Sequence, residues 1–146
     1  MSKDIKLVTE AAQTITEAMQ MEFVDNEGTS TPLAASFEFT TADPYAVSIL
    51  FHGEPAPVRW TFARDLLIEG FYEPTGDGDV HVWPCLSAEG NAVVILELNS
   101  PSGEVLIQVS SRAVSTFIHQ MLALVPQGAE GDLLDFDTEL TELLSA

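Results

Sequence analysis

The stretch RWTFARDLLIEGFYEPTGDGDVHVWP, residues 59–84, holds both tryptophans and two of the three arginines of the chain. Its pattern predicts a strand, a short helix, a turn-rich loop and a second strand. The first strand is expected at Val58–Phe62 and the second at Val80–Cys85, with the loop EPTGDGD before it. An acidic protein has therefore placed most of its arginines and all its indoles in one strand–helix–strand unit.

The short helix of this unit is expected over Ala63–Glu69, because Phe62, Leu66 and Leu67 have helical spacing. Thr61 can serve as its N-cap. Gly70 is expected to end the helix as its C′ residue, with Phe71 folding back on Leu66.

On either side of this unit, a two-residue alternation of apolar and polar side chains predicts further strands. DNEGTSTP (residues 25–32) separates the first two strands as a loop, and NSPSG (residues 99–103) joins the last two as a hairpin turn. The five additional strands are expected at residues 14–23, 33–39, 46–52, 92–98 and 105–109. Residues 92–98 are apolar on both faces instead of alternating, which predicts a central strand.

The chain ends in helical patterns. Apolar side chains from Val114 to Val125 recur at spacings of three and four, which predicts a long amphipathic helix. Ser110 or Ser111 would cap it, and Pro126 and Gly128 would stop it. A shorter terminal helix is expected over residues 136–144. The fold class is therefore α+β with a mainly antiparallel, seven-stranded sheet. One long helix cannot cover so large a sheet, so the uncovered apolar area is expected to meet another subunit.

Composition restricts the function. The 146 residues suit one domain, and the formal net charge is −18. Proteins that bind phosphate backbones or anionic membranes need clustered Lys and Arg, and only Arg59, Arg64 and Arg112 follow residue 6. Nucleic-acid partners and direct membrane insertion are therefore disfavoured. The single cysteine, Cys85, cannot form an internal disulfide, which is compatible with a reducing cytoplasm.

No catalytic, cofactor or metal motif is recognisable. His52, His81 and His119 lack ligand spacing, and TGDGD lacks the ligand pattern of an EF-hand. The candidate site residues are Trp60, Arg64, Asp65 and Trp83. We call residues 59–84 the signature stretch. Each arginine of this stretch is expected to reach a carboxylate elsewhere in the fold, with the tryptophans as core or cation–π partners. The alternative is a binding surface, because Arg and Trp are enriched at interface hot spots.

Several segments together resemble the SsgA-like proteins of actinobacteria, and most of all their SsgB branch. These segments are TADPYAV, W-x-FARDLL-x-EG, P-x-G-x-GDV-x-VWP and the terminal FDTEL run. The resemblance covers residues 14–146 as one domain and leaves 1–13 as an N-terminal extension. Carried by TADPYAV and the segments after it, the resemblance adds Asp43 and Tyr45 to the candidate site residues. It implies a fold similar to the Whirly and guide-RNA-binding proteins, assembled as a bell-shaped trimer.

The resemblance also implies a function. SsgB-type members are not enzymes and use no cofactor. They mark the future septum in the cytoplasm and recruit the division protein FtsZ, which is acidic as a family, and an SsgA-type relative helps to place them. The alternative, a single-stranded nucleic-acid-binding regulator, rests on fold analogy and is opposed by the charge.

Overall fold

The computed structural model describes residues 12–53 and 55–132. They form one sheet of eight antiparallel strands, in the order β4-β3-β2-β1-β8-β7-β6-β5, with two complete helices, and residues 130–132 are also helical. The strands are β1 (Thr14–Val24), β2 (Ser30–Thr40), β3 (Ala46–Phe51), β4 (Val58–Ala63), β5 (Thr75–Asp77), β6 (Val80–Leu86), β7 (Ala92–Ser100) and β8 (Gly103–Ser110). The helices are α2 (Arg64–Gly70) and α3 (Ser111–Leu124).

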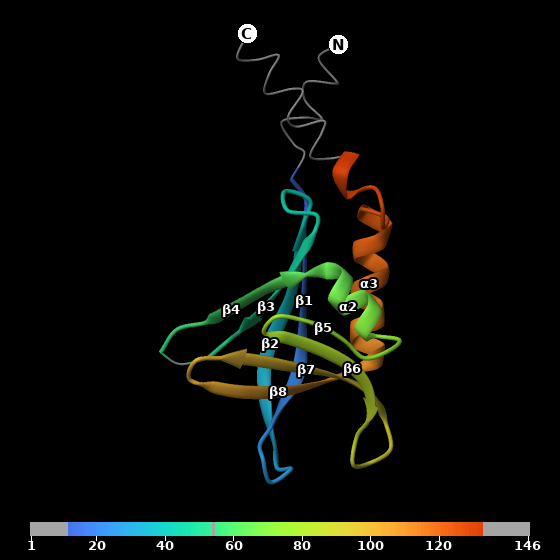
Figure 1. Cartoon of the computed structure of the whole chain (residues 1–146). Coiled ribbons are helices and arrows are strands. Elements are labelled where there is room, and N and C mark those ends of the chain that lie inside the picture. Colours follow the sequence, from blue (N-terminus) through green and yellow to red (C-terminus); the bar gives the residue numbers. More distant parts are fainter. Residues whose placement is uncertain (1–11, 54, 133–146) are drawn as a thin grey trace, which may run out of the picture.

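The sheet is strongly curved, and both helices pack against one of its faces. In Figure 1, β1 and β2 form a long ribbon that the other strands cross, and α3 runs beside this ribbon. Helix α2 contacts β3 and β4 near one end of the strand order and β5 and β6 at the other. This short helix therefore connects the two ends of the sheet, which places the signature stretch where the fold closes.

The core lies between the inner face of the sheet and the two helices. Phe37 of β2 stacks on Phe117 of α3 with 5.2 Å between ring centroids. Val114, Ile118 and Met121 extend the buried stripe of α3, as the helical spacing predicted. Full burial of each such side chain contributes about 1.5–3 kcal/mol to the free energy of folding.

The outer face of the sheet carries polar pairs between strands. The hydroxyl of Ser36 lies 2.9 Å from Nε2 of His52. Arg59 forms a 2.8 Å ion pair with Glu38. The large apolar side chains exposed among the described residues are scattered over separate elements: Tyr45, Val58, Tyr72 and Leu86. The expectation of a broad uncovered apolar face is therefore wrong for this part of the chain, because the sheet curls around its own core.

The predicted strands and the long helix are confirmed, but there are eight strands where seven were expected. Residues 75–77, assigned to the loop EPTGDGD, form β5 and pair with β6. Gly78, at φ 61°, takes the first position of the two-residue turn between them. A three-residue strand that contains glycine and aspartate has neither alternation nor β propensity, so its sequence did not reveal it.

Both ends of α2 differ from their predictions. The N-cap residue is Ala63, without a side-chain cap, because the Thr61 hydroxyl lies on the outer face at 2.8 Å from that of Ser48. Gly70 does not adopt a positive φ and lies inside the helix. It is small because Val82 of β6 packs directly against it.

Strand β2 begins at Ser30 and includes Pro32, within the predicted 25–32 loop. Proline is tolerated there because β3 pairs with β2 only from Ala35 onward, so that end of β2 is an edge. The expected terminal helix at 136–144 and residues 1–11 lie outside the described residues. Among the helices of the described ranges, none has the length and apolar character needed to cross a membrane.

Replacing Gly70 with alanine should destabilise the fold by about 1–3 kcal/mol, because the new Cβ overlaps the side chain of Val82. Chemical denaturation monitored by circular dichroism measures this change. Gly53→Ala is the matched control, since nothing lies within 4 Å of a Cβ built there. Equal stability of the two variants would show that α2 can move away from β6 at little cost.

Candidate functional site

Arg64, in the first turn of α2, is completely buried. Its Nη2 donates to Oε2 of Glu130 at 2.9 Å and to the carbonyl oxygen of Pro126 at 3.2 Å. Its guanidinium lies over the ring of Phe39, 5.4 Å from the centroid. A charge so deeply buried requires a close counter-charge, and Glu130 supplies it.

Two segments remote in sequence come to this arginine. The backbone N–H of Arg64 donates to the carbonyl of Tyr45 at 2.8 Å. This hydrogen bond joins the turn at residues 43–45, which we call the DPY turn, to the start of α2. The second segment is the loop after α3, where Gln127 donates from Nε2 to Oδ1 of Asp65 at 3.2 Å. We call Tyr45, Arg64, Asp65, Gln127 and Glu130 the arginine cluster.

The electrostatics of the cluster favour an ionised Glu130. Burial raises the pKa of this carboxyl, but hydrogen bonds outweigh burial and hold the pKa below its ordinary value. They come from its own backbone amide, from Arg64 and from the backbone amide of Gly128, which donates to Oε1 at 2.7 Å. Arg64 in turn has two buried atoms, Nε and Nη1, without a partner among the described residues.

Four of the six predicted site residues lie together at this end of α2. Asp43 and Tyr45 belong to the turn, and the Asp43 carbonyl accepts a 3.3 Å hydrogen bond from the Ala46 amide. Arg64 and Asp65 belong to the helix. The structure does not bring the two tryptophans to them or to each other. Trp60 pairs with Ile49 and packs beside the core, whereas Trp83 pairs with Ile95 on the outer face.

The expected carboxylate partners of Arg59 and Arg64 exist, as Glu38 and Glu130. The predicted cation–π role of the tryptophans is not seen, because Phe39 lies under Arg64 instead. Sequence analysis did not identify Phe39 or Glu130. A separation of 66 residues between the members of a pair has no periodic signal in sequence.

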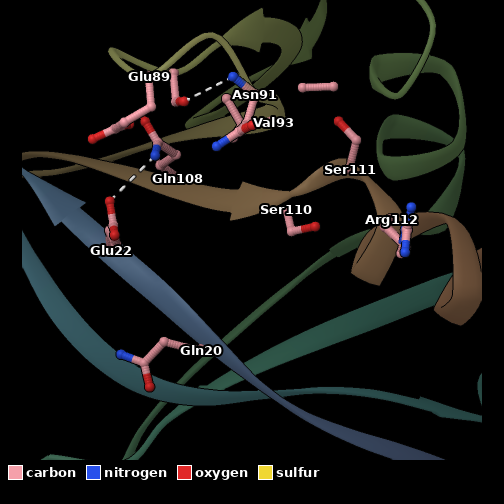
Figure 2. Close-up of a pocket in the computed structure, with 11 residues that line it drawn as sticks. Gln20, Glu22, Glu89, Asn91, Val93, Gln108, Ser110, Ser111 and Arg112 are labelled. Atoms are coloured by element: carbon pink, nitrogen blue, oxygen red, sulfur yellow. Dashed lines mark hydrogen bonds between the residues drawn. The ribbon is translucent and has the colours of Figure 1, made fainter.

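A polar cleft of about 610 Å³ opens on the outer face, where β1 separates from β8 beyond the Met21–Val109 pair. Figure 2 shows Glu22 and Gln108 at one end of it, joined by a 3.2 Å hydrogen bond, and Arg112 at the opposite end. The lining is Gln20, Glu22, Ser87, Glu89, Asn91, Ala92, Val93, Gln108, Ser110, Ser111 and Arg112.

The residues that line this cleft do not fit the binding of a nucleic-acid strand. Its lining contains neither histidine, lysine nor cysteine, and two carboxylates face one arginine. Single-stranded nucleic acids require a basic groove with stacking aromatics, and this lining has neither. Within residues 12–53 and 55–132, no three His, Cys, Asp or Glu side chains gather as metal ligands.

The two arginines of the signature stretch allow a matched stability comparison. Arg64→Met should cost about 3–5 kcal/mol, because it leaves the buried Glu130 carboxylate unpaired. Arg59→Met should cost at most about 1 kcal/mol, because its partner Glu38 remains accessible to water. Urea denaturation of both variants measures the difference. Similar costs would contradict the structural role of the cluster.

The lowered pKa of Glu130 predicts an acid-sensitive fold. The unfolded carboxyl titrates near 4.5, so the contribution of Glu130 to stability is complete above that pH and is lost as pH falls through the lower native pKa. Glu130→Gln should therefore lower the urea midpoint at neutral pH and approach the parent in acid. Glu104→Gln, at an exposed position of β8, controls for the loss of one negative charge.

Comparison with known proteins identifies the family. The family described as "Streptomyces sporulation and cell division protein, SsgA" matches residues 33–130. The sporulation-specific cell division protein SsgB of Streptomyces coelicolor is 43% identical over 133 residues, which are 90% of this chain and 96% of the relative. Its namesake from Thermobifida fusca is 36% identical over 94% of this chain and 100% of the relative.

Solved structures agree in fold. One comes from work that correlates mutations in SsgB with longitudinal cell division during sporulation of Streptomyces coelicolor. It matches with TM-score 0.79 at 42% identity and covers 84% of this chain and 96% of that one. An SsgA-like sporulation-specific cell division protein from Thermobifida fusca matches with TM-score 0.82 at 35% identity, over 90% of this chain and 96% of that one. The chain therefore belongs to the SsgA family of sporulation and cell-division proteins.

Proposed function

We propose that this chain is a non-enzymatic protein of sporulation-specific cell division, which marks the septum site, recruits FtsZ and promotes its assembly. The observation that carries the proposal is the 43% identity to an SsgB protein over nine-tenths of the chain. The matching family is one of sporulation and cell-division proteins, which supports an adaptor more than an enzyme. In this proposal, the protein acts in the cytoplasm at the septum, and an SsgA-type relative helps to position it.

The distribution of cations limits how an acidic partner can be bound. Arg59 and Arg64 already have carboxylate partners. Arg112, at the exposed start of α3 and at one end of the polar cleft, forms no ion pair with the described residues. FtsZ is itself acidic, so bulk attraction cannot drive the contact. We place the contact on a local surface around Arg112, because this arginine can offer an acidic partner a cation that forms no ion pair with the described residues.

We further propose that the protein works as a homotrimer. The support is the family resemblance, since the described residues do not expose the broad apolar face first expected. Several weak sites on one body engage a polymer more tightly than one site can. A trimer would therefore convert a modest contact with each FtsZ subunit into stable attachment to a filament.

Co-sedimentation with FtsZ polymers tests the proposal. The protein should pellet with FtsZ, and added salt should leave binding unchanged or strengthen it, because salt screens the repulsion between two acidic proteins. Arg112→Gln should reduce the bound fraction, whereas Arg59→Gln, which alters an arginine already paired with Glu38, should not. Light scattering on the same samples gives the oligomeric mass.

Two results would count against this function. The first is loss of FtsZ binding on modest addition of salt. The second is micromolar binding of a labelled single strand at low salt in a fluorescence-anisotropy titration, since low salt favours phosphate contacts most strongly. The second result would favour the nucleic-acid regulator suggested by analogy with the Whirly-type fold.

A further inference from the structure

The second half of the signature stretch forms a small pocket on the outer face of the sheet, separate from the arginine cluster and from the polar cleft. Its volume is about 350 Å³. The pocket lies over β5, β6 and β7, and its lining consists of Pro74, Thr75, Gly76, His81, Trp83 and Glu97. None of these side chains is explained by the core or by the Arg64–Glu130 pair.

Strand register builds this pocket. His81 and Trp83 are alternate residues of β6 and project to the same face, and Glu97 of β7 lies opposite His81. On the other side of β6, Gly76 of β5 is opposite His81. A Cβ at Gly76 would overlap the imidazole ring, so the backbone of β5 lies against the ring as it is placed here. The His81 ring and the Trp83 indole both line the pocket.

Glu97 has hydrogen-bonding capacity to spare. Its only ionic contact within the described ranges is to Nδ1 of His81 at 3.6 Å, which is longer than a hydrogen bond. That nitrogen is buried without a hydrogen-bond partner in the same part of the chain. Both polar groups at the base of the pocket thus lack a close partner, while Pro74 and Trp83 supply apolar walls.

A pocket lined by both a carboxylate and an indole is suited to a cation. The aromatic face attracts a cationic group, and a carboxylate accepts charge-assisted hydrogen bonds from it. No lysine or arginine lines the pocket. Asp77 and Asp79, in the adjacent β5–β6 hairpin, add negative charge nearby, and the chain as a whole carries −18. Charge complementarity therefore selects a positively charged occupant.

We propose that this pocket is a receptor for one lysine or arginine side chain of a protein partner, with Glu97 accepting its hydrogen bonds and Trp83 packing against its apolar stem and charge. The stem of such a side chain needs an apolar wall, and its head needs acceptors, and the pocket offers both in a volume of about 350 Å³. The inference goes beyond the proposed function and does not depend on FtsZ as the partner.

Trp83 can report on binding and Trp60 can serve as its internal control, because the two tryptophans lie on opposite faces of the sheet. The probe is the capped peptide acetyl-Gly-Arg-Gly-amide, added to the isotope-labelled full chain while NMR records the two indole N–H resonances. The Trp83 resonance should move and saturate, and the Trp60 resonance should stay. The same peptide with citrulline in place of arginine keeps the shape without the charge and should bind several-fold more weakly.

Variants then locate the contact. Glu97→Gln should weaken binding of the arginine peptide by about threefold or more, which corresponds to the loss of one partly exposed ion pair. Glu104→Gln removes a charge from the exposed start of β8 and should leave binding unchanged. Equal binding of the citrulline peptide, or an equal shift of Trp60, would overturn the proposal even if Glu97→Gln failed to fold. Equally tight binding of choline would overturn the assignment to an amino-acid side chain.

Discussion

The buried Arg64–Glu130 ion pair is the interaction on which the rest of the fold depends. Breaking a buried pair leaves an uncompensated charge in the core, which costs more than most single packing defects. Arg64 therefore joins three segments: its side chain holds the start of α2 to the segment after α3, and its backbone N–H donates to the DPY turn. Because α2 also contacts both ends of the strand order, the same pair determines how the curved sheet closes.

The signature stretch serves two purposes. In its first half, FARDLL, the buried side chain of Arg64 donates hydrogen bonds to Pro126 and Glu130, which lie after α3. Its second half, GDVHVWP (residues 78–84), contains the β5–β6 turn and most of β6. This half places His81 and Trp83 in the outer pocket that Glu97 also lines. Of the two tryptophans, Trp60 packs beside the core and Trp83 lies on the outer face. The arginines and indoles are concentrated in this stretch because it contains helix α2, which contacts both ends of the sheet, and strand β6, which lines a surface pocket.

The extreme acidity of the chain has a structural consequence for partner binding. Two of the three arginines are engaged by carboxylates of the same chain, so they are not available to an acidic partner. Only the surface near Arg112 combines an unpaired arginine with a recess among the described residues. The outer pocket around Trp83 has the opposite preference. Two separate surfaces of the described residues therefore differ in local charge, because one presents Arg112 and the other presents Glu97.

The sequence by itself determined the elements whose signal is local. Local patterns of apolar and turn-forming residues located seven of the strands, helical spacing located α3, and the charge disfavoured a basic nucleic-acid groove. The predicted site residues Arg64 and Asp65 also come together with the DPY turn. Tertiary structure alone decided the rest. Strand β5 forms because residues 75–77 pair with β6, Gly70 is small because Val82 packs on it, and Glu130 matters because Arg64 is buried. Each of these depends on contacts between residues distant in sequence, which no local periodicity encodes.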